Sequence, residues 1–102
     1  DAQESRGLGD VYKRQAVFRA GLASFTKIFA DTYARDNIRM NNVLPGWIDS
    51  LPSTEARRAS VPLQRYGSSE EVAATIAFLA SEGAAYITAQ NIRVDGGVTR
   101  AV

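Results

Sequence analysis

The sequence predicts an α/β fold in the order helix, strand, loop, helix, strand. Residues 16–35 and the segment after Ser68 repeat apolar side chains at helical spacing. Two short runs, 38–44 and 90–94, follow these helices and end in Pro-Gly and Asp-Gly-Gly, as strands do. A strand, a helix and a strand in succession form a right-handed crossover, so we expect the strands to be parallel. Two parallel strands are too few for a stable sheet, which predicts that the chain is the end of a larger α/β domain.

The first helix is predicted from one apolar face, formed by Phe18, Leu22, Phe25 and Phe29. Gly21 lies in the middle of this helix, where glycine is unfavourable, and we expect it to allow a close approach of another element. Asn37 is predicted to end the helix, because Asn tolerates the left-handed conformation.

The second helix is predicted from a capping box, Ser68-Ser-Glu-Glu71, in which the first and last residues satisfy each other's backbone N–H groups. Gly83 is expected to terminate it. Its apolar face is predicted to comprise Val72, Ile76 and Leu79. The intervening residues, 47–67, are predicted to be a loop with a short helix after Ser53.

Composition and charge exclude several classes of function. Lys and Arg number 12 against 11 Asp and Glu, a balance that argues against a nucleic-acid partner. The chain has no Cys and no His, so no disulfide, thiol nucleophile or metal site is predicted. No apolar run approaches the ~18 residues of a membrane span, and the N-terminus does not resemble a signal peptide. We therefore expect a cytoplasmic protein that binds neither membranes nor nucleic acids.

Residues 1–15 differ in character from the rest of the chain. They are polar and lack helical or strand periodicity. Each residue from Ser5 to Gln15 is encoded in one reading frame of a DNA string that resembles a transposase-based sequencing adaptor. We interpret residues 1–15 as translated adaptor, a non-native tail of the kind set aside before fold reasoning, and expect native sequence from Ala16. The alternative is a natural polar tail.

Four segments of residues 16–102 together resemble the C-terminal part of a short-chain dehydrogenase/reductase. They are Ile38-Arg-Met-Asn-Asn-Val-Leu-Pro-Gly46, Val61-Pro-Leu-Gln-Arg-Tyr-Gly-Ser-Ser-Glu-Glu-Val72, Ala77-Phe-Leu-Ala-Ser81, and Ala85-Tyr-Ile-Thr-Ala-Gln90 with Val94-Asp-Gly-Gly97. The resemblance implies a doubly wound, Rossmann-like parallel sheet of which this chain forms the end. Ala89 stands where the family commonly has glycine, so an unusual backbone conformation there would be strained.

The resemblance also implies where the family's Tyr-x-x-x-Lys pair would fall. Family spacing places Lys at Arg19 and Tyr at Gln15, the last residue of the proposed adaptor. Arg keeps the positive charge that binds ribose and stabilises a phenolate, but it does not release a proton. The alternative for Arg19 is a solvated or salt-bridged helix arginine. Tyr12 is out of register with the pair.

Pro45-Gly46-Trp-Ile-Asp-Ser50 matches the family's Pro-Gly-x-x-x-Thr turn. The resemblance implies contact of Pro45, Gly46, Ile48 and Ser50 with the nicotinamide of NAD or NADP, at the strand end where open α/β sheets bind ligands. The alternative is a purely structural turn that ends the strand. Trp47 either lines the substrate pocket or packs. Three arginines of the following loop, Arg57, Arg58 and Arg65, either attract an acidic substrate or are simply solvated.

The implied parent enzyme transfers hydride between a nicotinamide cofactor and a small alcohol or carbonyl substrate, and forms a homo-oligomer. The chain lacks the glycine-rich phosphate loop and the catalytic Tyr. We therefore expect it to be inactive alone and a poor binder of NAD or NADP. The alternative function is a truncated, non-catalytic dimerisation or interaction module.

Overall fold

The computed structural model describes residues 2–100, with side chains described for residues 13–100. A long helix, α1 (Ala2–Tyr33), continues into a 3-10 helix, η1 (Ala34–Asp36), and is followed by strand β1 (Asn42–Pro45). Helices α2 (Glu55–Ser60) and α3 (Ser69–Ala80) and a second 3-10 helix, η2 (Glu82–Ala84), then lead to strand β2 (Asn91–Val94). The predicted order of elements is confirmed, and α2 is the short helix expected within the loop.

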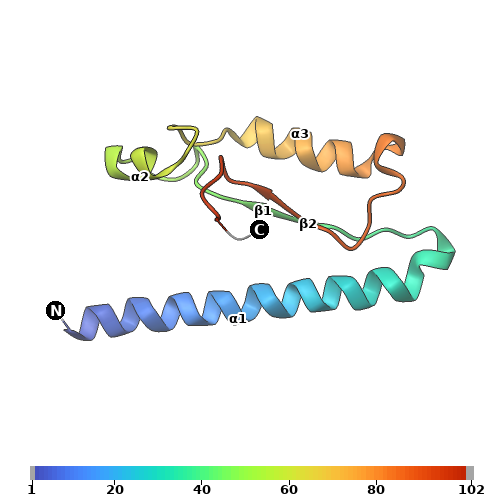
Figure 1. Ribbon diagram of the computed structural model, residues 1–102, viewed down its shortest axis with the longest axis horizontal. Helices are drawn as coiled ribbons and strands as arrows, with labels where there is room; N and C mark the ends of the chain where they lie inside the picture. The colour runs from blue at the N-terminus through green and yellow to red at the C-terminus, as the bar shows by residue number, and fades with distance from the viewer. Residues whose placement is uncertain (1, 101–102) are drawn as a thin grey trace.

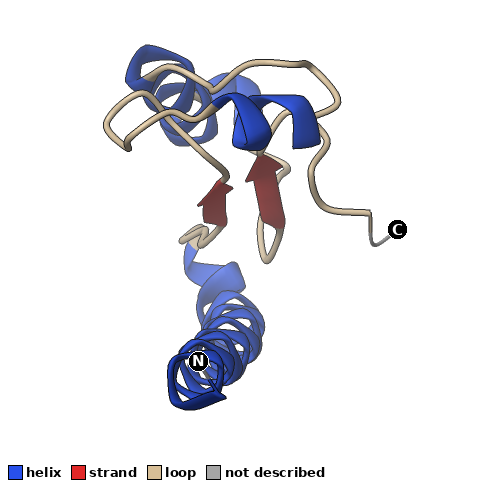
Figure 2. Ribbon diagram, turned by 90° about the vertical axis from the view of Figure 1, so that its left-hand side faces the viewer, coloured by secondary structure: helices blue, strands red, loops and turns tan. Residues whose placement is uncertain are grey.

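The two strands form a parallel sheet, as predicted, with Asn42 beside Asn91 and Pro45 beside Val94. Helix α1 covers one face of the sheet and α3 the other (Figure 1). Viewed along the helix, the strands form a middle layer between them (Figure 2). Helices on both faces of a parallel sheet define an α/β architecture.

Helix α1 begins earlier than the sequence predicted. It starts at Ala2, whereas apolar periodicity placed its start near residue 16. Periodicity reports only which face is buried, and backbone hydrogen bonds extend a helix through a polar stretch that lacks proline. The helical conformation therefore says nothing about the origin of residues 1–15.

Helix α1 and its 3-10 extension end at Asn37, as predicted. Asn37 adopts the left-handed conformation, with φ 59° and ψ 34°. Its N–H donates to the Ala34 carbonyl at 3.0 Å, and the Ile38 N–H donates to the Tyr33 carbonyl at 3.3 Å. These two bonds form a Schellman motif, which reverses the chain into the sheet.

Helix α1 is fastened to the sheet by a buried polar contact. The Thr26 hydroxyl donates to Asn42 Oδ1 at 3.1 Å. Asn42 Nδ2 then donates to Asn91 Oδ1 at 2.8 Å. Thr26 is 1% exposed and Asn42 8% exposed, so both polar groups depend on these partners rather than on water. One relay thus connects α1, β1 and β2.

The predicted apolar face of α1 is only partly turned inward. Leu22 and Phe29 are half-buried, beside the buried Thr26 and Ala30, whereas Phe18 and Phe25 are 72% and 54% exposed. Short side chains at this face let the helix approach the strands closely enough for Thr26 to reach Asn42. Nothing in the described chain lies within 4 Å of a Cβ built on Gly21, so the expected close approach at that glycine does not occur within the chain.

Helix α3 begins as predicted and ends differently. The Ser68 hydroxyl accepts from the Glu71 N–H, and the Glu71 carboxylate accepts from the Ser68 N–H, which confirms the capping box. The expected stop at Gly83 is wrong, because α3 ends at Ala80 and Gly83 lies inside η2. The Ser81 hydroxyl donates back to the Phe78 carbonyl at 2.6 Å, so a side chain ends the helix before the glycine is reached.

Strand β1 is shorter than the predicted strand 38–44, because the preceding residues pair irregularly with the chain that enters β2. The Met40 N–H donates to the Thr88 hydroxyl at 3.2 Å. The Ala89 N–H returns to the Met40 carbonyl at 2.8 Å. Ala89 holds φ 61°, the unusual conformation that the sequence anticipated at this position. A ladder cannot continue regularly through a left-handed residue.

Many large apolar side chains remain exposed. Val17, Ile28 and Leu63 are each more than 60% exposed, and Tyr86 is fully exposed. The radius of gyration is 16.3 Å, against about 13 Å for a globular chain of this length.

Among residues 2–100, no helix combines the length and apolarity needed to cross a bilayer.

Replacing Ala89 with glycine is expected to stabilise the chain by about 1 kcal/mol, because the left-handed conformation is costly only for a residue with a Cβ. The midpoint of urea unfolding, followed by far-UV circular dichroism, measures the change. Gln64→Gly is the matched control, since Gln64 has φ 62°. Its side chain also donates to the Ala59 and Val61 carbonyls, so this variant should gain less. The absence of a gain in Ala89→Gly would contradict the assignment of strain to Ala89.

Candidate functional site

The carboxyl ends of both strands open onto a cleft beside the first half of α1. This cleft, called here the turn cleft, has a volume of about 630 Å³. Its lining comprises Gln15, Arg19, Leu44, Pro45, Gly46, Trp47, Leu51, Arg93, Asp95, Val98 and Thr99. The structure therefore brings together four residues that sequence comparison selected from separate segments: Gln15, Arg19, Pro45 and Gly46.

Gly46 is required by contact with β2. Its N–H donates to the Val94 carbonyl at 3.0 Å. A Cβ at this position would lie 2.8 Å from the Asp95 Cβ and 2.9 Å from its Cα, closer than nonbonded carbons approach. The absence of a side chain thus lets the end of β1 lie directly against the end of β2. This packing alone requires glycine at position 46, with or without a cofactor.

Ile48 and Ser50 lie outside the described lining of the turn cleft. They belong to a turn that the Leu51 N–H closes on the Ile48 carbonyl at 2.9 Å, and Leu51 itself faces the cleft. Ile48 is bridged to Gly67, which ties this turn to the segment that enters α3. In the described part of the chain the Ile48 N–H and the Ser50 hydroxyl make no hydrogen bond, so both remain available to a ligand.

Asp95 organises the far wall of the turn cleft. Its carboxylate accepts from the Gly97 N–H at 2.9 Å and from the Thr99 N–H at 3.1 Å. The Thr99 side chain is the main cause that lowers the pKa of Asp95; burial acts in the opposite direction, and the Gly97 and Thr99 N–H groups add to the lowering. Arg93 donates to the Thr99 hydroxyl at 3.4 Å. The sequence flagged Asp95 only as part of a turn and did not flag Arg93.

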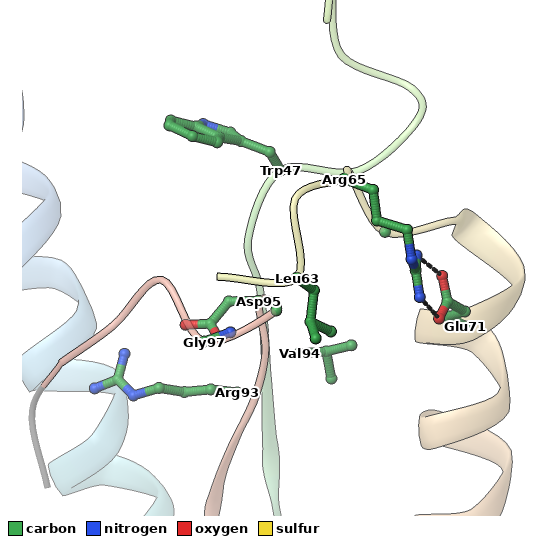
Figure 3. Close-up of a pocket in the computed structure, with 10 residues that line it drawn as sticks. Trp47, Leu63, Arg65, Glu71, Arg93, Val94, Asp95 and Gly97 are labelled. Carbon is green, nitrogen blue, oxygen red and sulfur yellow. Dashed lines mark hydrogen bonds and ion pairs between the residues drawn. The ribbon is translucent and has the colours of Figure 1, made fainter. Parts of the chain in front are cut away.

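A second cleft lies on the α3 side of the same strand ends (Figure 3). This α3-side cleft has a volume of about 430 Å³. Its lining comprises Trp47, Leu63, Arg65, Gly67, Glu71, Arg93, Val94, Asp95, Gly96 and Gly97. Trp47, Arg93 and Asp95 line both clefts, so these three residues form a shared wall. The sequence did not predict this cleft, because its walls come from three separate segments.

Trp47 packs against two other side chains of the loop. Its ring stacks on Tyr66 at 5.9 Å between centroids, and the Arg57 guanidinium lies 5.8 Å from the Trp47 ring centroid. The Tyr66 hydroxyl donates to the Pro52 carbonyl at 2.9 Å, and Arg57 donates to the same carbonyl at 3.2 Å. Trp47 therefore both packs and lines the clefts, which joins the two alternatives that the sequence left open.

The three loop arginines are engaged within the loop. Arg65 forms two parallel hydrogen bonds with the Glu71 carboxylate, at 2.8 and 2.9 Å (Figure 3). Arg58 donates to the Ser53 hydroxyl. Together with the stacking of Arg57 on Trp47, these contacts favour a role in loop structure over attraction of an acidic substrate.

Comparison with known proteins identifies the family. The profile of the family described as enoyl-(acyl carrier protein) reductase matches residues 3–99. The chain belongs to the short-chain dehydrogenase/reductases, as the sequence motifs indicated. It is 44% identical over 90 residues to the 3-oxoacyl-[acyl-carrier-protein] reductase FabG of Thermotoga maritima, covering 81% of this chain and 37% of that protein. It is 42% identical over 87 residues to nodulation protein G of a Rhizobium species, covering 78% and 36% respectively.

Solved structures agree. The crystal structure of YwfH, described as an NADPH-dependent reductase involved in bacilysin biosynthesis, superposes with a TM-score of 0.74 at 35% identity, over 81% of this chain and 38% of that one. A short-chain dehydrogenase from Bacillus anthracis gives 0.72 at 34% identity, over 81% and 36%. The chain thus has the fold of the corresponding part of these proteins, and it spans little more than a third of their length.

Gly46→Ala is expected to destabilise the chain by about 1–3 kcal/mol, because the added Cβ meets the Asp95 backbone and β2 must shift away from β1. Gly21→Ala makes the same chemical change at an open position in α1 and should instead stabilise by about 1 kcal/mol. Urea unfolding of both variants measures the difference. A neutral Gly46→Ala would show that the strand ends are not in the contact described.

The pairing of Glu71 should make α3 sensitive to acid. Hydrogen bonds from the Arg65 side chain, and then from the Ser68 backbone, lower the pKa of Glu71 from 4.5 to about 2. A carboxylate with a lowered pKa stabilises the folded state above pH 4.5, and this contribution is lost as the pH falls from 4.5 toward 2. Helical circular dichroism should therefore fall over that range, and less so in Glu71→Gln. Glu70→Gln removes the same charge outside the capping box and should behave like the wild type.

Proposed function

We propose that this chain is the C-terminal portion of an NAD(P)-dependent oxidoreductase that interconverts a small alcohol and a carbonyl compound in the cytoplasm. The observation that carries the proposal is the turn cleft. It joins the two α1 positions of the family's catalytic pair to the Pro45–Gly46 turn. Membership of the short-chain dehydrogenase/reductases supports it.

The residues around the turn cleft fit a nicotinamide nucleotide. Arg19 offers a fixed positive charge and several N–H donors for ribose hydroxyls. The free Ile48 N–H and Ser50 hydroxyl, in the adjoining turn, offer donors for a carboxamide. When bound, the cofactor supplies or accepts a hydride. The chain's own residues bind and orient it, and the parent's Tyr at position 15 would exchange a proton with the substrate oxygen.

The chain as it stands is proposed to be inactive. Gln15 occupies the Tyr position, and an amide is neither acidic nor basic enough to exchange the proton. The sequence also lacks the glycine-rich loop that would hold the cofactor's pyrophosphate. We therefore expect no turnover and no saturable binding of NAD(H) or NADP(H). The substrate class of the parent is a small-molecule alcohol or carbonyl compound.

The exposed apolar side chains support assembly with further protein surface. Val17, Gly21, Phe25 and Ile28 follow one another along the solvent side of α1. They suit either a homo-oligomeric parent or the second candidate function, a non-catalytic dimerisation or interaction module. The reading frame upstream of Ala16 at the source locus separates the two. A glycine-rich loop, with Tyr directly before Ala16, supports both the enzyme and the adaptor interpretation of residues 1–15.

The catalytic register can be tested in a chimera. The upstream half of the Thermotoga maritima reductase is joined to this chain from Gln15 onward, with and without Gln15→Tyr. Oxidation of NADPH by a panel of small ketones is measured. The chimera with Gln15→Tyr should be about 10²–10⁴-fold faster, the usual contribution of a positioned acid or base.

The matched control for the chimera is Val17→Gln, which introduces the same amide at an exposed position of α1, 73% exposed. Val17→Gln should leave the rate of NADPH oxidation within a few-fold of the rate of the chimera without it. Equal rates with and without Gln15→Tyr, in chimeras that bind NADPH equally, would contradict the register and with it the proposed function.

A further inference from the structure

The end of the short helix α2 carries the sequence Arg57-Arg-Ala-Ser-Val61, in which two arginines precede a serine. Ser60 is the last residue of α2 and is exposed. Among the serines and threonines of the chain, Ser60 alone follows arginines at both the second and the third preceding position. Ser68 has an arginine three residues before it, but that arginine, Arg65, is paired with Glu71, and the Ser68 hydroxyl caps α3.

Helix α2 contributes no buried side chain to the structure, although it spans six residues, Glu55–Ser60. It is closed at one end by the Thr54 hydroxyl, which accepts from the Arg57 N–H at 3.2 Å. At the other end the Ser60 hydroxyl donates to the Arg57 carbonyl at 2.7 Å. A helix this short and without a packed face opens at little cost. The segment that leads to Ser60 is therefore accessible to a modifying enzyme, while the buried Val61 anchors the chain behind it.

The two arginines supply the charge by which a kinase recognises a serine. Protein kinases distinguish their substrates by the pattern of charges around the accepting hydroxyl. Arg57 donates to the Pro52 carbonyl and Arg58 to the Ser53 hydroxyl, so each bonds to a neutral oxygen of its own loop. Guanidinium groups form stronger, paired hydrogen bonds with carboxylates. An acidic groove on a kinase therefore offers both arginines a better partner than the loop does.

A phosphate on Ser60 would act on Trp47 through Arg57. The Arg57 guanidinium lies 5.8 Å from the centroid of the Trp47 ring, and Trp47 borders both clefts. Residues three apart on a helix are neighbours, so Arg57 is within reach of a group on Ser60. A phosphate carries about −1.5 to −2 charges and binds guanidinium through paired hydrogen bonds. It also opposes the helix dipole at the carboxyl end of α2, which favours opening of the last turn.

We propose that Ser60 is a phosphorylation site for an arginine-directed serine kinase, and that the phosphate draws Arg57 away from Trp47, the wall shared by the two clefts. In the transfer, the Ser60 oxygen bonds to the γ-phosphorus of ATP and the bond from that phosphorus to the bridging oxygen breaks. ADP leaves, and the hydroxyl proton passes to a base of the kinase. The inference does not rest on the proposed function, because recognition of Ser60 involves neither a nicotinamide cofactor nor a reducible substrate.

The site is tested by incubating the chain with Mg-ATP and the catalytic subunit of cyclic-AMP-dependent protein kinase, an arginine-directed enzyme. Mass spectrometry of the digested chain locates the phosphate. We expect a single phosphate, on Ser60, and no labelling of Ser60→Ala. Arg58→Ala should slow labelling about tenfold or more, because it removes a charge pair with the kinase. Arg35→Ala removes an exposed arginine far from Ser60 in the sequence and should leave the rate unchanged.

The emission of Trp47, the only tryptophan of the chain, tests the effect of the phosphate on the clefts. Labelling should shift the emission maximum of the wild type to that of unlabelled Arg57→Ala, and Ser60→Ala treated in the same way should not shift. No labelling, labelling at another residue, or equal rates for Arg58→Ala and Arg35→Ala would overturn the assignment of the site. Labelled Ser60 with unchanged Trp47 emission would overturn the coupling to the clefts.

Discussion

The hydrogen-bond relay from Thr26 through Asn42 to Asn91 is the constraint on which the rest of the structure depends. Its first two members, Thr26 and Asn42, are buried, so each of them loses water and requires its partner. A shift of β1 against β2 by one residue would separate the two asparagine side chains and turn neighbouring positions to the opposite face. The relay therefore fixes the strand register and the position of α1 together. The alignment of Gly46 against Asp95, and of Arg19 beside the strand ends, follows from that register.

Features set by a few adjacent residues could be predicted from the sequence. The capping box of α3 and the left-handed end at Asn37 each depend on local hydrogen bonds, and both were found. The orientation of α1 depends on what it packs against. Of the predicted face, Leu22 and Phe29 are half-buried, but Phe18 and Phe25 are exposed. Thr26 faces the sheet and bonds to Asn42, 16 residues further along the chain. Periodicity identified the helix and part of its buried face, but it could not show this polar partner.

The candidate site, too, divides into features that the sequence predicted and features that it did not. Counting along the family motif placed Arg19 and Gly46 in one region, and both line the turn cleft. The sequence did not single out Arg93, and it singled out Asp95 only as part of a turn, because a single strand residue and an Asp-Gly-Gly turn have ordinary structural explanations. Gly46 also has a structural reason that the sequence did not suggest, because it leaves room for the Asp95 backbone.

Charge pairing explains how one end of the sheet presents two clefts of different character. Around the α3-side cleft, Arg65 is paired with Glu71, and the Asp95 carboxylate accepts hydrogen bonds from backbone N–H groups. On the other side of Trp47, Arg19 and the turn that follows Gly46 keep donors available. The two clefts thus differ in the hydrogen-bonding capacity of their walls, in a chain whose net charge is +1.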